Sequence, residues 1–416
     1  MLRAGALLYV MGLTLVIGLL SSFFILSAYY WQVINIGYDN IERITVNCES
    51  GINLLLSKQN IVGINEKKTI DLYGDNKDSV ELERKLWGLF EIVTCKAHYK
   101  RNSISKAALV GFYNQRDVAL YVSGNDRPLS VCGNTRIKGN CFLRQTDVRR
   151  AYIEGQSFSG IKLIDGTIKK SERRIPELNK EALNRSIDFL ENAREDSLIS
   201  WEEITVGNNT LINSFDKKTI RVTALNTIRI KNRNFTGNII IHSSKEIRVD
   251  KSAILKDIIL IAPKIFIEDS CQFILQAFAS DSLVVGKNCK LNYPSNIGIL
   301  SNDNTSAASF VSIGEKSELS GSAIIYTESN SQNVSQIKIS KDALVKGLVY
   351  SNGVADVQGS IFGSLYCNGI LLTTLSSVYE NHLLNSTIDV TKLSRYFIST
   401  GVFEQSDNKK IIKWIN

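Results

Sequence analysis

The first part of the chain is apolar without interruption. Residues Ala4 to Tyr38 include no Asp, Glu, Lys or Arg, and the most apolar part of this stretch ends at Trp31. Its length exceeds the roughly 20 apolar residues that a helix needs to cross a bilayer. We therefore predict a transmembrane anchor at residues 1–31, with membrane lipid as a partner.

The residues at the two ends of this stretch predict its orientation. Tyr29, Tyr30 and Trp31 close it with aromatic side chains, which favour the membrane interface. Arg3 supplies positive charge at the other end, and positive charge favours the cytoplasmic side. We therefore predict a single-pass membrane protein, with a cytoplasmic N-terminus and the bulk of the chain outside.

A cleaved secretory signal is the alternative for this segment. Such a signal has an apolar core of about 7 to 15 residues before a small-residue cut site, and this core is longer. The apolar periodicity also continues beyond Ser27-Ala28 as in an amphipathic helix, at Val33, Ile34, Ile36, Ile41, Ile44 and Val46. We therefore predict a retained anchor that continues as a helical stalk over residues 32–56.

A degenerate repeat in the C-terminal half predicts the fold of the head. Each copy has an apolar-x-apolar triplet, a few small or polar residues and a second apolar run. Alternation within a triplet predicts a short strand with one buried face, which a single copy cannot bury alone. The copies begin at Ile247, Ile265, Leu283, Val311 and Ile337, and the first three of these are evenly spaced.

Stacking of these copies predicts the fold class. We predict a mainly β protein in which an irregular right-handed β-solenoid follows the transmembrane α-helix and stalk and is interrupted by a helical insertion. An ordinary β-sandwich with regular turns is the alternative. Tight corners are predicted at the small residue that follows each triplet, namely Ala253, Cys271, Cys289, Ser317 and Ala343.

The repeat divides the rest of the chain into segments. Residues 201–372 are the predicted β-solenoid, and residues 57–166 are a first β-rich part that includes the first solenoid turns. Residues 373–416 are a capping segment and tail, because solenoid ends need caps. Residues 167–200 are the helical insertion, with Pro176 at a helix start and one apolar side at Leu178, Leu183, Ile187 and Leu190.

Composition limits the partners. Hydrophobic residues make up 44% and charged residues 22% of the chain, which is typical of a globular protein. The net charge of +8 is spread along the chain, apart from a block at Lys169-Lys170 and Arg173-Arg174. We therefore predict no nucleic-acid partner and a diffuse attraction to anionic envelope polymers.

The cysteines and histidines predict no metal site and no cofactor. Seven cysteines occur without a Cys-x-x-Cys pair, and three histidines lie far apart in the sequence. Cys132 and Cys141 could pair as a disulfide in an oxidising compartment, because a short loop costs little to close. Small buried hydrophobic side chains are the alternative interpretation of these two residues.

The search for catalytic motifs predicts a protein without enzymatic activity. The chain has no Gly-rich phosphate loop, His-Glu-x-x-His helix or Gly-x-Ser-x-Gly elbow. Some solenoid enzymes cut polysaccharides with Asp, Lys or Arg residues stacked on one face. The candidates here, which we interpret as solvated turns, are Asp250, Lys251, Asp269, Asp281 and Lys287.

Small residues within the anchor predict a contact with another helix. Gly12, Gly18 and Ser22 could line such a contact, since small side chains let helix backbones approach closely in a membrane.

The start of the chain, Arg3-Ala4-Gly5-Ala6-Leu7-Leu8, resembles the N-terminus of type IV pilin-like proteins, particularly minor pilins and minor pseudopilins of pilus and type II secretion machines. The resemblance implies cleavage by a prepilin peptidase between Gly5 and Ala6, followed by methylation of the new N-terminus. It also implies that the apolar helix forms a filament core with a β-rich head outside, in contact with pilus or secretion proteins. Val10 stands where this family usually has Glu.

The predicted coil resembles the polymer-forming domain of bactofilins, in which short right-handed β-helices join end to end. This resemblance implies self-association. Our leading interpretation is a pilin-like subunit or component of a pilus or type II secretion-like assembly. The alternatives are a bactofilin-like membrane-tethered scaffold and a glycan-acting β-helix enzyme.

Overall fold

The structure is a computed structural model of the 416-residue chain. It describes residues 4–57, 61–74, 78–100, 102–113, 117–124, 126–192, 196–301, 308–327, 334–402 and 408–415. Two compact units divide the chain. Unit 1 comprises Met1–Arg84 and Val93–Lys106, and unit 2 comprises Lys85–Ile92 and Ala107–Asn416.

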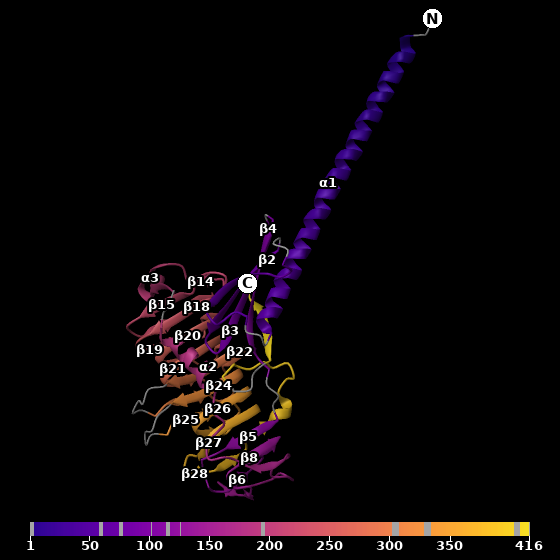
Figure 1. The fold of residues 1–416 in the computed structure, drawn as a ribbon. Helices are drawn as coiled ribbons and strands as arrows, with labels where there is room; N and C mark the ends of the chain where they lie inside the picture. Colours follow the sequence, from indigo (N-terminus) through magenta and orange to yellow (C-terminus); the bar gives the residue numbers. More distant parts are fainter. Residues whose placement is uncertain are drawn as a thin grey trace. The chain divides into compact units, whose positions relative to one another are not determined.

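Unit 1 contains a single long helix, α1 (Ala4–Leu56), which spans 53 residues (Figure 1). It also contains much of an antiparallel sheet with the strand order β1-β2-β3-β4-β31. Three of these strands continue into unit 2. The strands are β1 (Glu66–Asp71), β2 (Ser79–Trp87), β3 (Phe90–Tyr99), β4 (Asn102–Phe112) and β31 (Lys409–Ile415).

Unit 2 is built around parallel strands that join into one closed sheet (Figure 1). Its strands are β5 (Val118–Val122), β7 (Arg136–Lys138), β8 (Asn140–Leu143), β12 (Ile168–Lys170), β13 (Ser197–Ser200), β14 (Thr210–Asn213), β15 (Ile220–Ala224), β16 (Ile228–Ile230), β17 (Asn234–Gly237), β18 (Ile239–Ser243), β19 (Glu246–Val249), β20 (Ile254–Ile267), β21 (Gln272–Val285), β22 (Lys290–Ser301), β23 (Phe310–Ile313), β24 (Glu318–Thr327), β25 (Gln336–Ile339), β26 (Leu344–Val357), β27 (Ser360–Thr373), β28 (Val378–Glu380) and β30 (Thr387–Asp389).

Smaller elements complete unit 2. A three-stranded parallel sheet contains β6 (Leu129–Cys132), β9 (Val148–Arg150) and β29 (His382–Leu384). A short antiparallel pair contains β10 (Tyr152–Ile153) and β11 (Gln156–Ser157). The helices are α2 (Lys180–Glu191), α3 (Trp201–Val206) and the 3-10 helix η1 (Val390–Lys392).

The predicted repeat positions stack in register. Five buried residues form one continuous parallel row, in the order Ile247, Ile265, Leu283, Val311 and Ile337. Each copy of the repeat therefore adds one strand to this row, whether its spacing from the previous copy is 18 residues or longer.

Tight corners with a left-handed residue recur at four of the five predicted small positions, Ala253 being the exception. Four non-glycine residues adopt positive φ values between 54° and 60°, namely Ser270, Asn288, Lys316 and Asp342. Each directly precedes a small buried residue of the repeat, namely Cys271, Cys289, Ser317 and Ala343. A left-handed residue costs energy unless its surroundings enforce it. Here backbone hydrogen bonds between successive corners hold the chain in place, as from Lys290 N to Cys271 O at 2.7 Å.

The mainly β fold and the N-terminal apolar helix are confirmed. The parallel strands join into one closed sheet rather than a clear solenoid of short strands, and strand length is the reason. Four strands, β20, β21, β26 and β27, are each 14 residues long. Such a strand continues through more than one corner, so that β20 pairs with the three shorter strands β17, β18 and β19. The long strands thereby join neighbouring sets of short strands into one sheet.

The order of the strands differs from the prediction for residues 57–166. The sequence predicts the first turns in the segment from β5 to β9, but β5 pairs with β27 from Leu365↔Leu120 to Cys367↔Val122. Strand β8 then pairs with β5, and β12 pairs with β8. These strands therefore follow the C-terminal strands of the closed sheet. Apolar alternation identifies the buried face of a strand but does not identify the strand with which it pairs.

The predicted insertion and cap are also corrected. Among the described residues of 167–200, only the 12 residues of α2 are helical, and this helix begins after the N-cap Asn179 rather than at Pro176. Asn179 Oδ1 accepts a hydrogen bond from Ala182 N at 2.9 Å, which satisfies a free N–H group of the first turn. Within 373–416, β29 and β30 pair with β6 and β7, and β31 joins the antiparallel sheet.

Candidate functional site

The first part of α1 is exposed along its whole circumference. All side chains from Gly5 to Ile36 are exposed, and the most apolar 18-residue window has a mean hydropathy of 2.2. Within the described ranges, α1 is the helix that is long and apolar enough to cross a membrane. An apolar surface on every side of a helix suits a lipid environment rather than one protein face.

The predicted processing and packing residues lie on this exposed part. A Cβ atom built on Gly5, Gly12 or Gly18 would meet no atom within 4 Å, and Ser22 is also exposed. Gly18 and Ser22 are four residues apart and share a helix face, whereas Gly12 lies on another face. Cleavage before Ala6 and packing at these residues stay predictions. Met1 and Arg3 lie outside the described residues.

The second part of α1 has one buried face. Ile44, Cys48, Ile52 and Leu55 are at most 4% exposed, whereas Val46 on another face and Ile41, one turn before Ile44, are about half exposed. Spacings of three and four residues place the buried side chains on one side of the helix. We call this face, with the strand residues it contacts in unit 1, the helix seat.

Polar contacts surround the helix seat. The guanidinium of Arg43 pairs with the carboxylate of Asp78, whose side chain is fully buried, and it lies 4.8 Å from the centroid of the Tyr99 ring. A second ion pair joins Lys106 Nζ to Glu49 Oε1 at 2.6 Å. A buried carboxylate needs a charged partner, so Arg43 fixes the helix at this point.

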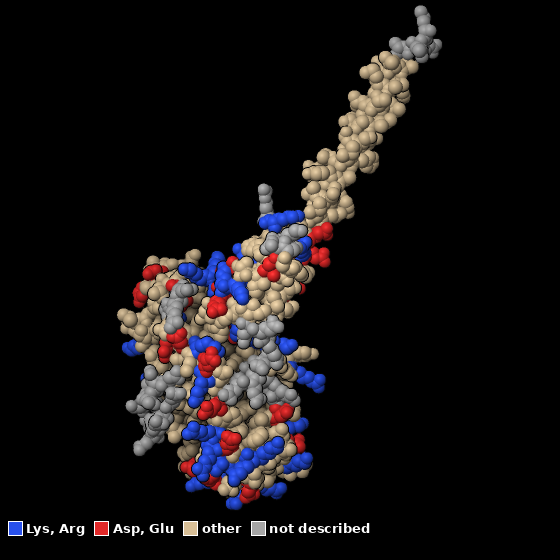
Figure 2. Space-filling view, in the orientation of Figure 1, with Lys and Arg blue, Asp and Glu red and all other residues tan. Residues whose placement is uncertain are grey.

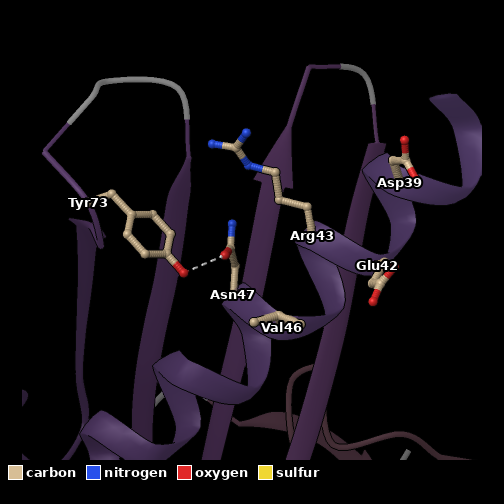
Figure 3. Close-up of a pocket in the computed structure, with 6 residues that line it drawn as sticks. All are labelled: Asp39, Glu42, Arg43, Val46, Asn47 and Tyr73. Atoms are coloured by element: carbon tan, nitrogen blue, oxygen red, sulfur yellow. Dashed lines mark hydrogen bonds between the residues drawn. The ribbon is translucent and has the colours of Figure 1, made fainter.

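A groove opens beside Arg43. It has a volume of about 390 Å³ and is lined by Asp39, Glu42, Arg43, Val46, Asn47 and Tyr73. Figure 3 shows the Tyr73 hydroxyl directed at Asn47, to which it donates a hydrogen bond of 3.2 Å, while Asp39 and Glu42 extend from α1. The lining residues include neither His nor Cys, so the groove offers no thiol or imidazole as a ligand or nucleophile.

The predicted disulfide residues lie in different parts of the core. Cys132 is buried beside Ile153 and Leu372, whereas Cys141 is buried in the large cluster that contains Leu120. Both thiols are free in the structure, and burial raises the pKa of Cys141 to about 12. A bond between Cys132 and Cys141 stays a prediction.

The candidate catalytic residues make local contacts. Asp250 accepts hydrogen bonds from Ser252 N at 2.8 Å and Ser252 Oγ at 2.6 Å, and the hydroxyl contact lowers the pKa of its carboxyl. Asp269 Oδ1 accepts a bond from Lys287 N at 2.7 Å. Such contacts are typical of turns, and the absence of enzymatic activity stays a prediction.

The remaining candidates form ion pairs. Asp281 pairs with Lys264 at 3.4 Å, and the ammonium group of Lys287 pairs with Glu315 at 3.0 Å. For Lys251 the structure shows an exposed position in the turn before β20. The described part of the chain contains no group of three or more His, Cys, Asp or Glu side chains that could hold a metal ion.

Positive charge gathers at one end of unit 2. Residues 126–174 contain 11 Lys and Arg and 5 Asp and Glu, so 11 − 5 = +6 of the total +8 lies in this segment. Figure 2 shows Lys and Arg gathered, with fewer acidic residues, over the end that carries β6 and β8. Three strands of this end each present two exposed basic side chains, namely Arg136 and Lys138 on β7, Arg149 and Arg150 on β9, and Lys169 and Lys170 on β12.

This basic end was missed in the sequence, where the charge was interpreted as diffuse. A running count of charge along the chain would have found it. The fold also concentrates this charge, because it brings β7, β9 and β12 to one end of unit 2.

Comparison with known proteins identifies no family. No protein-family model matches the chain, and no curated protein matches it. Among solved structures, the crystal structure of competence-associated pilin ComZ from Thermus thermophilus matches 85% of this chain and 86% of its own chain. The sequence identity is 9% and the TM-score is 0.25, which is too low to show a shared fold.

Proposed function

We propose that the chain is a non-enzymatic, single-span envelope protein, a pilin-like subunit or component of a pilus or type II secretion-like assembly. Its β-rich head stands outside the inner membrane. The observation that carries this proposal is the division of α1 into a fully exposed apolar part and a part seated on the sheet of unit 1.

The length of the exposed part supports a membrane span with helix left over. Residues 5–36 extend for about 48 Å at 1.5 Å per residue, whereas the hydrocarbon core of a bilayer is about 30 Å thick. The excess leaves apolar helix for tilt or for contact with neighbouring helices of an assembly. The N-terminal resemblance to pilin-like proteins points to the same use of this helix.

For the head, we interpret the closed sheet as a short, irregular β-solenoid. The continuous parallel row from Ile247 to Ile337 and the recurring corners support this interpretation, because each turn of the chain buries its apolar face on the next. The basic end of this head would attract anionic polymers of the envelope.

A membrane-tethered scaffold is the second candidate function. Apolar side chains are exposed at the strands that begin the closed sheet, with Leu198 on β13 63% exposed and Ile212 on β14 67% exposed. Exposed apolar side chains of this kind favour contact with another copy. Purified protein that stays monomeric at high concentration would exclude this candidate.

The intact mass and N-terminal sequence of protein recovered from its host membranes test the leading proposal. A chain that begins at Ala6 and carries an additional methyl group supports the pilin-like function. A chain that retains Met1 to Gly5 contradicts it and favours the scaffold.

A binding experiment tests the basic end separately. Reversing two charges in Arg149→Glu/Arg150→Glu should weaken binding to lipopolysaccharide vesicles by about tenfold or more, since each basic residue near an anionic surface contributes about 1 kcal/mol. The control Lys251→Glu/Lys341→Glu makes the same charge change at exposed turn residues before β20 and β26, and should have little effect. Equally tight binding to double-stranded DNA would contradict the prediction of no nucleic-acid partner.

A further inference from the structure

Two thiols meet inside the helix seat. Cys48 on α1 and Cys95 on β3 are both fully buried, and the Cys48 thiol donates a hydrogen bond to the Cys95 carbonyl oxygen at 3.1 Å. The sulfur of Cys48 thus lies beside the backbone of the residue that carries the second thiol.

Gly51 brings the second sulfur equally close to the helix. A Cβ atom built on Gly51, one turn after Cys48, would lie 2.5 Å from Cys95 Sγ. The Cys95 thiol therefore occupies the space directly under the helix backbone. Interaction with the Cys95 thiol lowers the pKa of Cys48, and interaction with the Cys48 thiol raises the pKa of Cys95.

A second pair of thiols, Cys271 and Cys289, also interacts, since each thiol is the largest cause of the shifted pKa of the other, but its geometry differs. Cys271 and Cys289 lie at equivalent positions of adjacent parallel turns, since Lys290 N donates to Cys271 O. Neighbouring strands are about 4.8 Å apart and their equivalent side chains point in the same direction, whereas a disulfide needs Cβ atoms about 3.8 Å apart. A helix packed on a strand directs its side chains toward the strand, so Cys48 and Cys95 face each other.

We propose that Cys48 and Cys95 are a disulfide site that links α1 covalently to β3. The proposal rests on the proposed function for its location, because disulfides persist in oxidising compartments outside the cytoplasm. The oxidant is a protein disulfide of the thiol–disulfide oxidoreductase class, which acts while the chain folds and both thiols are accessible.

The reaction balances through a mixed disulfide. The Cys48 thiol loses its proton, attacks one sulfur of the oxidant's disulfide and releases the other sulfur as a thiolate. The Cys95 thiolate then attacks the Cys48 sulfur and displaces the oxidant. Two cysteine thiols thereby lose two protons and two electrons, and the oxidant's disulfide becomes a dithiol.

The bond would secure the helix seat. It closes the chain between residues 48 and 95, which restricts the unfolded chain and favours the folded form. It also keeps α1 attached to β3 when the membrane anchor and the head are pulled apart.

Peptide mapping of the full-length protein tests the proposal. Protein extracted from host membranes without reductant is alkylated under denaturing conditions, digested and analysed by mass spectrometry. We expect a peptide pair linked through Cys48 and Cys95, which disappears in Cys48→Ser and Cys95→Ser and persists in the control Cys367→Ser. The linked form should also unfold at a higher temperature than the reduced form, and Cys48→Ser should show no such difference.

A second sample separates this proposal from the proposed function. The purified, reduced protein is partly unfolded in detergent and reoxidised with oxidised glutathione. Linkage in this sample but not in the membrane sample supports the disulfide site and contradicts the placement of the head outside the cytoplasm. Failure to link Cys48 to Cys95 in either sample overturns the disulfide proposal, whereas the N-terminal mass decides the pilin-like function independently.

Discussion

The two parts of α1 belong to one continuous helix but have opposite surroundings. From Gly5 to Ile36 every side chain is exposed, whereas Ile44, Cys48 and Ile52 on the second part are buried. The first part is apolar on all sides and the second part on one side only. This difference shows that one part is suited to lipid and the other to a protein surface, so the same substitution should have different effects on the two parts.

The largest expected effect comes from charge in the first part. Leu15→Asp/Leu19→Asp places two carboxylates in the centre of the span, at a cost of about 3 kcal/mol each, and should move the protein from the membrane fraction to the soluble or aggregated fraction. The matched control Tyr38→Asp/Ile41→Asp should remain in the membrane. Equal fractionation of both variants would contradict the proposed boundary of the span.

The next effect comes from a cavity in the helix seat. Ile44→Ala removes a fully buried side chain and should lower the free energy of unfolding by about 2 to 5 kcal/mol. Ile41→Ala, at a half-exposed position one turn earlier in the same helix, should change it by less than about 0.5 kcal/mol. Denaturant unfolding of both variants in detergent measures the difference, and similar losses would show that α1 is not seated as described.

A smaller effect comes from crowding. In Gly51→Ala the new methyl group would lie 2.5 Å from Cys95 Sγ and 2.8 Å from Leu82 Cδ2, and such overpacking costs about 1 to 3 kcal/mol. Gly12→Ala meets open space and should keep the full stability of the head. If thermal unfolding of the head in detergent shows no loss for Gly51→Ala, the close approach of helix and strand is contradicted.

The smallest effect is expected at the edge of the seat. Glu49→Ala removes one partner of Lys106, in a partly exposed ion pair that contributes about 0.2 to 1 kcal/mol. Raising the salt concentration should reduce the difference from the unsubstituted chain. A loss that is large and independent of salt would mean that this pair is more buried than the structure shows.

The sequence predicted the helix and the stacked repeat residues, because both depend on a local pattern of apolar residues. The uncharged run from Ala4 predicted the helix, and the repeat at Ile247, Ile265 and Leu283 predicted the residues that stack in register. The pattern could not predict that β5 pairs with β27 or that β31 joins β4, because pairing depends on which edges meet after folding.

The candidate site was predicted less completely. The anchor could be identified because lipid imposes a composition on every residue of the span. The thiol pair in the helix seat could not, since Cys48 and Cys95 are far apart in the sequence and meet only when α1 packs on β3. The basic end, by contrast, could have been found from a running count of charge over residues 126–174.

Labelling from outside the cell membrane tests the central claim most directly. All seven native cysteines are buried, so a cysteine introduced by Tyr152→Cys, at a side chain that is 73% exposed, would be the accessible thiol. In intact spheroplasts this variant should react with a membrane-impermeant maleimide, and the unsubstituted chain should not. Labelling that occurs only after the membrane is opened would place the head on the cytoplasmic side and contradict the proposed orientation.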